Sequence, residues 1–227
     1  MSKTYVIYYG WLTNERGELT PDAKRIAEAQ VPLLIAPLKV AAPATHVNLS
    51  PQLISRLRDA GTEVVAYVDT DYGKVSSSVA KQQVADAIAA GVDGVFYDRT
   101  TAWPGEPSLQ YYAAISEPAK VAGKMVIANP GVSQCGDMLL RFADRVMLEH
   151  KWRNLAHDSP WTAGQSPETF MGVSSNEHFA MGYGVDEQRA LADTREAWEQ
   201  GVGWHTSTDM YKHLPVWFEA YVKGIKS

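Results

Sequence analysis

The chain has 227 residues and a formal net charge of −5 at pH 7, with 45% hydrophobic and 21% charged residues. This balance is typical of a globular protein with a sizeable core. An acidic chain without a basic stripe argues against nucleic acid as a partner, and no apolar stretch approaches the roughly 20 residues of a membrane span. Cys135 is the single cysteine, which excludes an intrachain disulfide and a thiolate metal cluster.

Short apolar runs recur along the chain, and each is followed by a stretch with helical character. A near-continuous run of β-branched or aromatic residues is typical of a buried parallel strand. The strands predicted in this way cover residues 5–10, 33–37, 63–69, 94–98, 125–129, 145–149, 179–183 and 203–206.

The predicted helices have recognisable start and stop signals. Thr20-Pro21-Asp22 and Ser50-Pro51 are typical helix starts, and several helical stretches are followed directly by glycine. Pro118 is expected to kink or split its helix. The first predicted helix begins at residue 20. The other predicted helices cover residues 50–58, 76–90, 108–122, 135–142, 186–200 and 214–225.

The regular alternation of strands and helices predicts the fold. Strands about 25–30 residues apart suit right-handed βαβ units. Eight such units close most naturally into a barrel, so we predict an α/β fold, a single compact (β/α)8 TIM barrel formed by residues 1–227 as one domain. A doubly wound open sheet is the alternative, but no GxGxxG loop follows the first strand. Residues 152–177 are expected to form an ordered loop or lid.

The fourth and sixth predicted strands both end on an acid, Asp98 and Glu149. The C-terminal ends of barrel strands carry the active site. Strand alternation places Asp98 on the face of Phe96 and Glu149 on the face of Met147, as the last inward residue of each strand. A carboxylate pair across one cleft is the minimum machinery of a glycosidase. A helix cap at Asp98, or an ion pair of Glu149 with Arg99 or Lys151, is the purely structural alternative.

Other strand ends supply a polar, acidic ring with aromatic walls. Flat aromatic faces in a polar cleft suit sugar rings, so these residues are predicted to bind substrate. Asp71 and Asp209 could equally cap helices, and the tryptophans of the loops, Trp103 among them, could equally fill the core. The predicted substrate-binding residues are Tyr9, Lys39, Asp69, Asp71, Arg99, Asn129, Trp152, Tyr183, His205 and Asp209.

Metal and thiol chemistry find little support in the sequence. The six histidines show neither HxH nor HExxH spacing, and we expect no metal and no cofactor. Cys135 is interpreted as a buried helix residue. A metal-dependent hydrolase stays open as an alternative, with a site formed by Asp69, Asp98, Glu149 and His205.

Four blocks follow one another along the chain, AYVDTDYG at residues 66–73, DGVFYD at 93–98, IANPG at 127–131 and MLE at 147–149. In this order they resemble the spherulin-4-like glycoside hydrolases of family 135 and the related family 114 polygalactosaminidases. The resemblance is close over about residues 33–149 and looser over residues 179–209.

The resemblance implies a (β/α)8 fold and endo-hydrolysis of an α-1,4-linked galactosamine or N-acetylgalactosamine polymer. It implies that Asp98 and Glu149 are catalytic, and Asp69 and Asp71 would then suit the ammonium group of an amino sugar. Where the family often has Asp-Glu, this chain has Asp98-Arg99, so a non-catalytic carbohydrate-binding barrel is the alternative. The sequence as written shows no signal peptide and predicts a cytoplasmic protein, although the family is typically secreted and a trimmed extracellular form is the alternative.

The expected mechanism is that of a retaining glycosidase. Asp98 attacks the anomeric carbon, and Glu149, whose pKa is raised by burial and by the neighbouring carboxylate, protonates the leaving oxygen. Asn129 is expected to orient Asp98 or to bind a sugar hydroxyl. An Asp98–Arg99 ion pair that turned the carboxylate away from the cleft would contradict this mechanism.

Overall fold

The computed structural model describes residues 3–14, 16–39, 47–131, 135–151, 179–199, 202–209 and 212–226, with the backbone alone for residues 149–151 and 183. Its strands form one eight-stranded sheet in the order β1 to β8, and all neighbouring strands are parallel. The strands are β1 (Val6–Ile7), β2 (Leu33–Pro37), β3 (Glu63–Asp69), β4 (Gly94–Asp98), β5 (Met125–Ala128), β6 (Arg145–Lys151), β7 (Phe179–Tyr183) and β8 (Trp204–Thr208).

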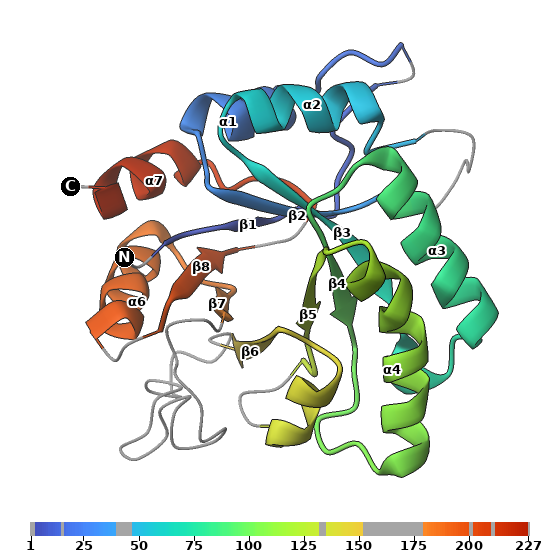
Figure 1. The fold of residues 1–227 in the computed structure, drawn as a ribbon. Helices are drawn as coiled ribbons and strands as arrows, with labels where there is room; N and C mark the ends of the chain where they lie inside the picture. The colour runs from blue at the N-terminus through green and yellow to red at the C-terminus, as the bar shows by residue number, and fades with distance from the viewer. Residues whose placement is uncertain are drawn as a thin grey trace.

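The helices lie outside the strands, with α3 and α4 beside β3 to β5, and α6 beside β8 (Figure 1). This arrangement is a nearly closed (β/α)8 barrel, and it confirms the predicted fold class. None of the described helices is long and apolar enough to cross a bilayer. The helices are α1 (Pro21–Ala29), α2 (Pro51–Asp59), α3 (Ser77–Ala90), α4 (Glu106–Val121), α6 (Glu187–Glu199) and α7 (Phe218–Lys226), with short 3-10 helices η1 (Asp71–Gly73) and η2 (Asp137–Arg141).

The first helices begin where the sequence predicts. The hydroxyl oxygens of Thr20, Ser50 and Ser76 each accept a hydrogen bond from a backbone N–H in the first turn of α1, α2 and α3. Gly91 ends α3 in the left-handed conformation, with φ at 94°. The predicted split at Pro118 is wrong, because α4 continues to Val121 and the proline removes a hydrogen bond only near the end of the helix.

Strand alternation separates two layers of core. Side chains that point into the barrel form one buried cluster, and the residues between them pack outward against the helices. Phe96 and Met147 lie in the inner cluster, as predicted from their alternation with the acids. The inner cluster consists of Tyr5, Ile7, Leu33, Ile35, Val65, Phe96, Ile127, Met147, Phe179, Met181 and Trp204.

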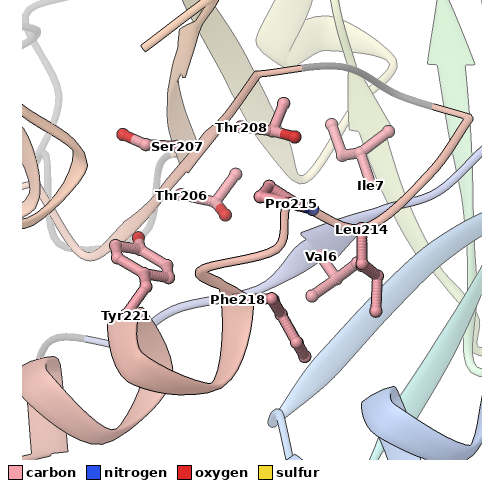
Figure 2. Close-up of a pocket in the computed structure, with 9 residues that line it drawn as sticks. All are labelled: Val6, Ile7, Thr206, Ser207, Thr208, Leu214, Pro215, Phe218 and Tyr221. Carbon is pink, nitrogen blue, oxygen red and sulfur yellow. The ribbon is translucent and has the colours of Figure 1, made fainter. Parts of the chain in front are cut away.

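Among the described residues, one bridge closes the barrel between β8 and β1, and it pairs Lys3 with Trp204. The Lys3 amide donates to the Gly203 carbonyl over 2.9 Å, and the His205 amide donates to the Lys3 carbonyl over 3.0 Å. We call this region the β1–β8 seam. A cavity of about 20 Å³ lies in it, bounded by Ile7 and Thr208 of the strands, by Leu214 before α7 and by Phe218 in α7 (Figure 2).

A buried hydrogen-bond chain joins α6, α7 and β8 beside this seam. The Thr194 hydroxyl lies 2.8 Å from the Tyr221 hydroxyl and 2.9 Å from the His205 Nδ1 atom. Tyr221, which also borders the cavity in Figure 2, extends the chain towards Thr4 at 3.5 Å. These bonds satisfy polar groups that have been removed from water.

Replacing Tyr221 by phenylalanine is expected to lower the free energy of unfolding by about 1–3 kcal/mol, because buried partners such as Thr194 lose a hydrogen bond. Tyr111→Phe is the matched control, because the Tyr111 hydroxyl is buried without a hydrogen-bond partner among the described residues. Its expected change is within about 0.5 kcal/mol. Urea unfolding measures both variants, and equal losses would contradict the structural role of the chain.

Candidate functional site

The candidate site is built around Asp98 at the C-terminal end of β4. The parallel register pairs Asp98 with Asp69 of β3, and the next strand, β5, is followed directly by Asn129. The Tyr67 hydroxyl donates to Asp98 Oδ2 over 2.8 Å, and the Asn129 amide donates to Asp98 Oδ1 over 2.7 Å. Both carboxylate oxygens therefore accept a hydrogen bond from a neighbouring strand end.

The environment of Asp98 raises the pKa of its carboxyl group. Burial is the largest cause, and the negative charge of Asp69 adds to it, while the hydrogen bonds from Tyr67 and Asn129 act in the opposite direction. Burial also raises the pKa of the Tyr67 hydroxyl, which keeps it protonated as the donor. The arrangement holds Asp98 as an oriented acceptor that takes up a proton at higher pH than an ordinary aspartate.

Arg99 does not pair with Asp98 but turns to the end of β3. Its Nε atom donates to Asp69 Oδ1 over 2.9 Å, and its Nη2 atom bonds Asp69 Oδ2. Its Nη1 atom lies 2.9 Å from Asp71 Oδ1. One guanidinium group therefore holds both acids, while the hydrogen bonds to Asp98 come from the Tyr67 and Asn129 side chains and from the Arg99 backbone.

The backbone around this ion-pair cluster is strained. Apart from Gln30, the described non-glycine residues with positive φ are Asp71 at 43°, Tyr72 at 57° and Arg99 at 53°. Such conformations cost on the order of 1–3 kcal/mol each and persist where the surrounding structure holds them. Here the Tyr72 amide donates to the Arg99 carbonyl over 2.7 Å, which joins the two strained segments.

A groove of about 360 Å³ opens beside Asp98 over the ends of β2 and β3, and we call it the β2–β3 groove. The rings of Tyr9 and Tyr67 lie in contact in its wall, with centroids 4.8 Å apart. The Lys39 ammonium lies 3.7 Å from an Asp86 carboxylate oxygen at its rim. The groove is lined by Tyr9, Pro37, Leu38, Lys39, Ala66, Tyr67, Val68, Asp69, Gln83, Asp86 and Ala87.

The structure thus brings most of the predicted residues on the first five strands together. Asn129 bonds Asp98, Arg99 bonds Asp69 and Asp71 on the neighbouring strand end, and the β2–β3 groove adds two more predicted residues at its border. Those two residues are Tyr9 and Lys39.

The structure corrects the prediction that His205 binds substrate. The side chain is 1% exposed and bonds Thr194 of α6, whereas its neighbour Trp204 points into the barrel. Burial lowers the pKa of His205 to about 3, so the ring stays neutral and structural. This placement removes His205 from the residues that can reach a ligand at Asp98, and with it one of the four ligands of the metal-dependent alternative. Among the described residues, no group of three or more potential ligand side chains is placed to hold a metal ion.

The predictions on the last strands are tested only in part. The backbone places Glu149 in β6, paired in register with Met181, and Tyr183 at the end of β7. The catalytic role of Glu149 and the role of Tyr183 in substrate binding stay predictions. Trp152 lies outside the described residues. Asp209 follows β8 with its Oδ1 atom buried and without a hydrogen-bond partner among the described residues.

Two predictions on single side chains in this region are also settled. Cys135 is buried, as predicted, but it precedes η2 and so is not a helix residue. Burial raises the pKa of its thiol to about 12, so it carries no thiolate at neutral pH. Trp103 does not fill the core, because its side chain is 65% exposed.

Sequence reasoning missed the partners of the candidate site rather than its centre. It did not identify Tyr67 as a partner of Asp98, although alternation with Asp69 places Tyr67 on the inner face of β3. It did not identify Gln83 and Asp86, because the face of α3 that borders the groove depends on how the helix packs. The ion pairs of Arg99 had no sequence signal, since an arginine with positive φ is rare.

Comparisons with known proteins identify a matching family and several similar solved structures. A family model described as spherulation-specific family 4 matches residues 30–225. The crystal structure of Aspergillus clavatus Sph3 in complex with GalNAc is 17% identical, with a TM-score of 0.75 over 100% of this chain and 98% of that chain. A chitinase from Chromobacterium violaceum is 11% identical, with a TM-score of 0.60 over 100% of both chains. The GH18 chitinase ChiB of Flavobacterium johnsoniae is 11% identical, with a TM-score of 0.56 over 98% of this chain and 93% of that chain. The search of curated proteins found no match.

Proposed function

The chain belongs to spherulation-specific family 4, and from that premise we propose that it is a glycoside hydrolase that cleaves within a polymer of α-1,4-linked galactosamine or N-acetylgalactosamine. The family and the fold of its neighbours support a barrel that binds carbohydrate or hydrolyses glycosides. The observation that carries the finer proposal is Asp98, a carboxylate at the C-terminal mouth of the barrel whose two oxygens are oriented by Tyr67 and Asn129 beside the β2–β3 groove.

In the proposed reaction Asp98 is the nucleophile. Each carboxylate oxygen has two lone pairs. The hydrogen bonds from Tyr67 and Asn129 therefore leave a lone pair on each oxygen that can attack the anomeric carbon. The same bonds stabilise the ionised form and fix its direction, which favours attack over free rotation. Glu149 is proposed to protonate the leaving oxygen and then to activate the water that releases the sugar. No metal or cofactor takes part in this scheme.

The ion pairs of Arg99 bear on the substrate. An ammonium group of a free amino sugar would have to compete with a guanidinium that already bonds both Asp69 and Asp71. The expectation that these two acids bind an ammonium is therefore revised in favour of a neutral, N-acetylated unit. The Sph3 structure, which is described as a complex with GalNAc, agrees with this preference.

A non-catalytic carbohydrate-binding barrel is the second candidate. The observation that favours it is Arg99, which stands where the family often has an acid. In this case the groove and the aromatic walls would bind glycan, and no bond would be broken.

The release of reducing ends from a panel of polysaccharides tests the proposal. Polymers of α-1,4-linked N-acetylgalactosamine are expected to be cleaved faster than the deacetylated polymer, and a chelator is expected to have no effect. Binding of the polymer without any release of reducing ends would support the non-catalytic barrel. Loss of activity with the chelator would instead support a metal-dependent hydrolase.

A further inference from the structure

We propose that the β2–β3 groove is a flanking subsite, which binds a further sugar unit of the same glycan chain whose cleaved unit lies at Asp98. The inference rests on the proposed function, since it takes the ligand to be a polysaccharide. It adds that the ligand extends across the end of β3 towards α3, and that recognition requires more than one sugar unit.

Tyr67 makes the groove continuous with the candidate site. Its hydroxyl bonds Asp98 over 2.8 Å, while its ring lines the groove against Tyr9. Asp69 also lines the groove and is bonded by Arg99 from the other side. A sugar held at Asp98 would therefore lie next to the groove, with Tyr67 in contact with both positions.

The lining of the groove suits a sugar ring. Pro37, Leu38 and Val68 give it apolar surface, and Lys39 and Gln83 place polar groups around this surface. A pyranose ring presents the same combination, with apolar C–H faces and hydroxyls at its edge. The volume of about 360 Å³ lies at the lower end of the roughly 300–1,000 Å³ of ligand pockets, which fits one or two sugar units rather than a large cofactor.

The polar rim is held in place but remains accessible. Asp86 accepts a hydrogen bond from the Gln82 amide over 2.8 Å and lies 3.7 Å from the Lys39 ammonium. This separation is long for a hydrogen bond, and the Lys39 side chain is 58% exposed. An ammonium group has three donors, so Lys39 can bond a sugar hydroxyl while it stays near Asp86.

The test places an indole side chain at the rim. Gln83 is exposed on α3 and lines the groove, so Gln83→Trp is expected to occupy it without disturbing the core. Ala85→Trp is the matched control, because Ala85 is exposed on the same helix and does not line the groove. Binding is measured by calorimetry with α-1,4-linked N-acetylgalactosamine oligomers of increasing length, in a Glu149→Gln background so that the oligomers stay intact.

The protein without a substitution in the groove is expected to bind the longer oligomers about tenfold or more tightly than it binds the monosaccharide. Gln83→Trp is expected to remove this gain and to leave the affinity for the monosaccharide unchanged, while Ala85→Trp keeps it. A second variant, Lys39→Met, is expected to reduce the gain several-fold and covers the case in which Gln83→Trp does not fold.

The inference is overturned if affinity does not increase with length, if the gain survives in both Gln83→Trp and Lys39→Met, or if Ala85→Trp loses it equally. Because the readout is binding, it is independent of turnover. A barrel that binds in a length-dependent manner but cleaves nothing would refute the proposed hydrolase and leave the flanking subsite intact.

Discussion

Replacing Asp98 by asparagine is expected to lower the rate of glycan cleavage by about 10³-fold or more with the fold intact. Asparagine has nearly the same shape but no charge with which to attack an anomeric carbon. One of its two side-chain positions becomes a donor, which then faces the donor of Tyr67 or of Asn129. The release of reducing ends from the cleaved polysaccharide measures the loss, and circular dichroism checks the fold.

Glu149→Gln is expected to lower kcat/KM by a similar factor on the natural polymer, but by less on aryl glycosides with acidic leaving groups. Such leaving groups depart without protonation, whereas the attack by Asp98 is needed for both kinds of substrate. Glu117→Gln on the exposed face of α4 is the control and should keep full activity. Full activity in Asp98→Asn would remove Asp98 from the mechanism, and an equal loss on all leaving groups would assign Glu149 a different role.

Arg99→Met is expected to move the acidic limb of the pH–activity profile to higher pH, and so to lower the activity at pH values on that limb. Asp98 acts in its ionised form, so activity falls as the pH drops through the pKa of Asp98. The charge of Asp69 raises this pKa, and Arg99 neutralises Asp69 through two hydrogen bonds. Without the guanidinium group, the repulsion from Asp69 increases and the proton is held to higher pH.

The pH profile of kcat/KM measures this effect, and Arg58→Met is its control. Arg58 forms a comparable ion pair with Asp93 at 2.8 Å, but on α2, away from the candidate site. A profile that Arg99→Met leaves unchanged would show that Arg99 only supports the η1 turn.

The substitution of Arg99 by an acid, Arg99→Glu, distinguishes the two proposed functions. A hydrolase should lose activity when a third acid faces Asp69 and Asp71, whereas a barrel inactivated by Arg99 should gain it.

The sequence predicted the barrel because each βα unit carries its own signals. The caps at Thr20, Ser50 and Ser76 and the apolar runs that end at Asp69 and Asp98 are local features, and the parallel register then brings the strand ends to one rim. Local signals of this kind do not depend on how distant segments pack.

The wrong predictions concern features that depend on how distant segments pack, or on which face of a strand a given residue occupies. In β8 the inward residue is Trp204, which turns His205 to the outside, since a shift by one residue exchanges the two faces of a strand. The short β1 could not be predicted from its apolar run, because its length depends on how far β8 reaches alongside it. Likewise, the conformation of Arg99 is imposed by contacts with the η1 turn.

The β1–β8 seam is where local unfolding of the barrel is expected to begin. Among the described residues one bridge crosses the seam, so the molecule resembles an open sheet rolled up, whose first and last strands share few backbone hydrogen bonds. Local unfolding begins where the fewest backbone bonds must break, so amide protons on either side of Lys3 should exchange before those of β3 and β4. Because Asp98 lies on the well-paired β4, such opening can occur without disturbing the carboxylate.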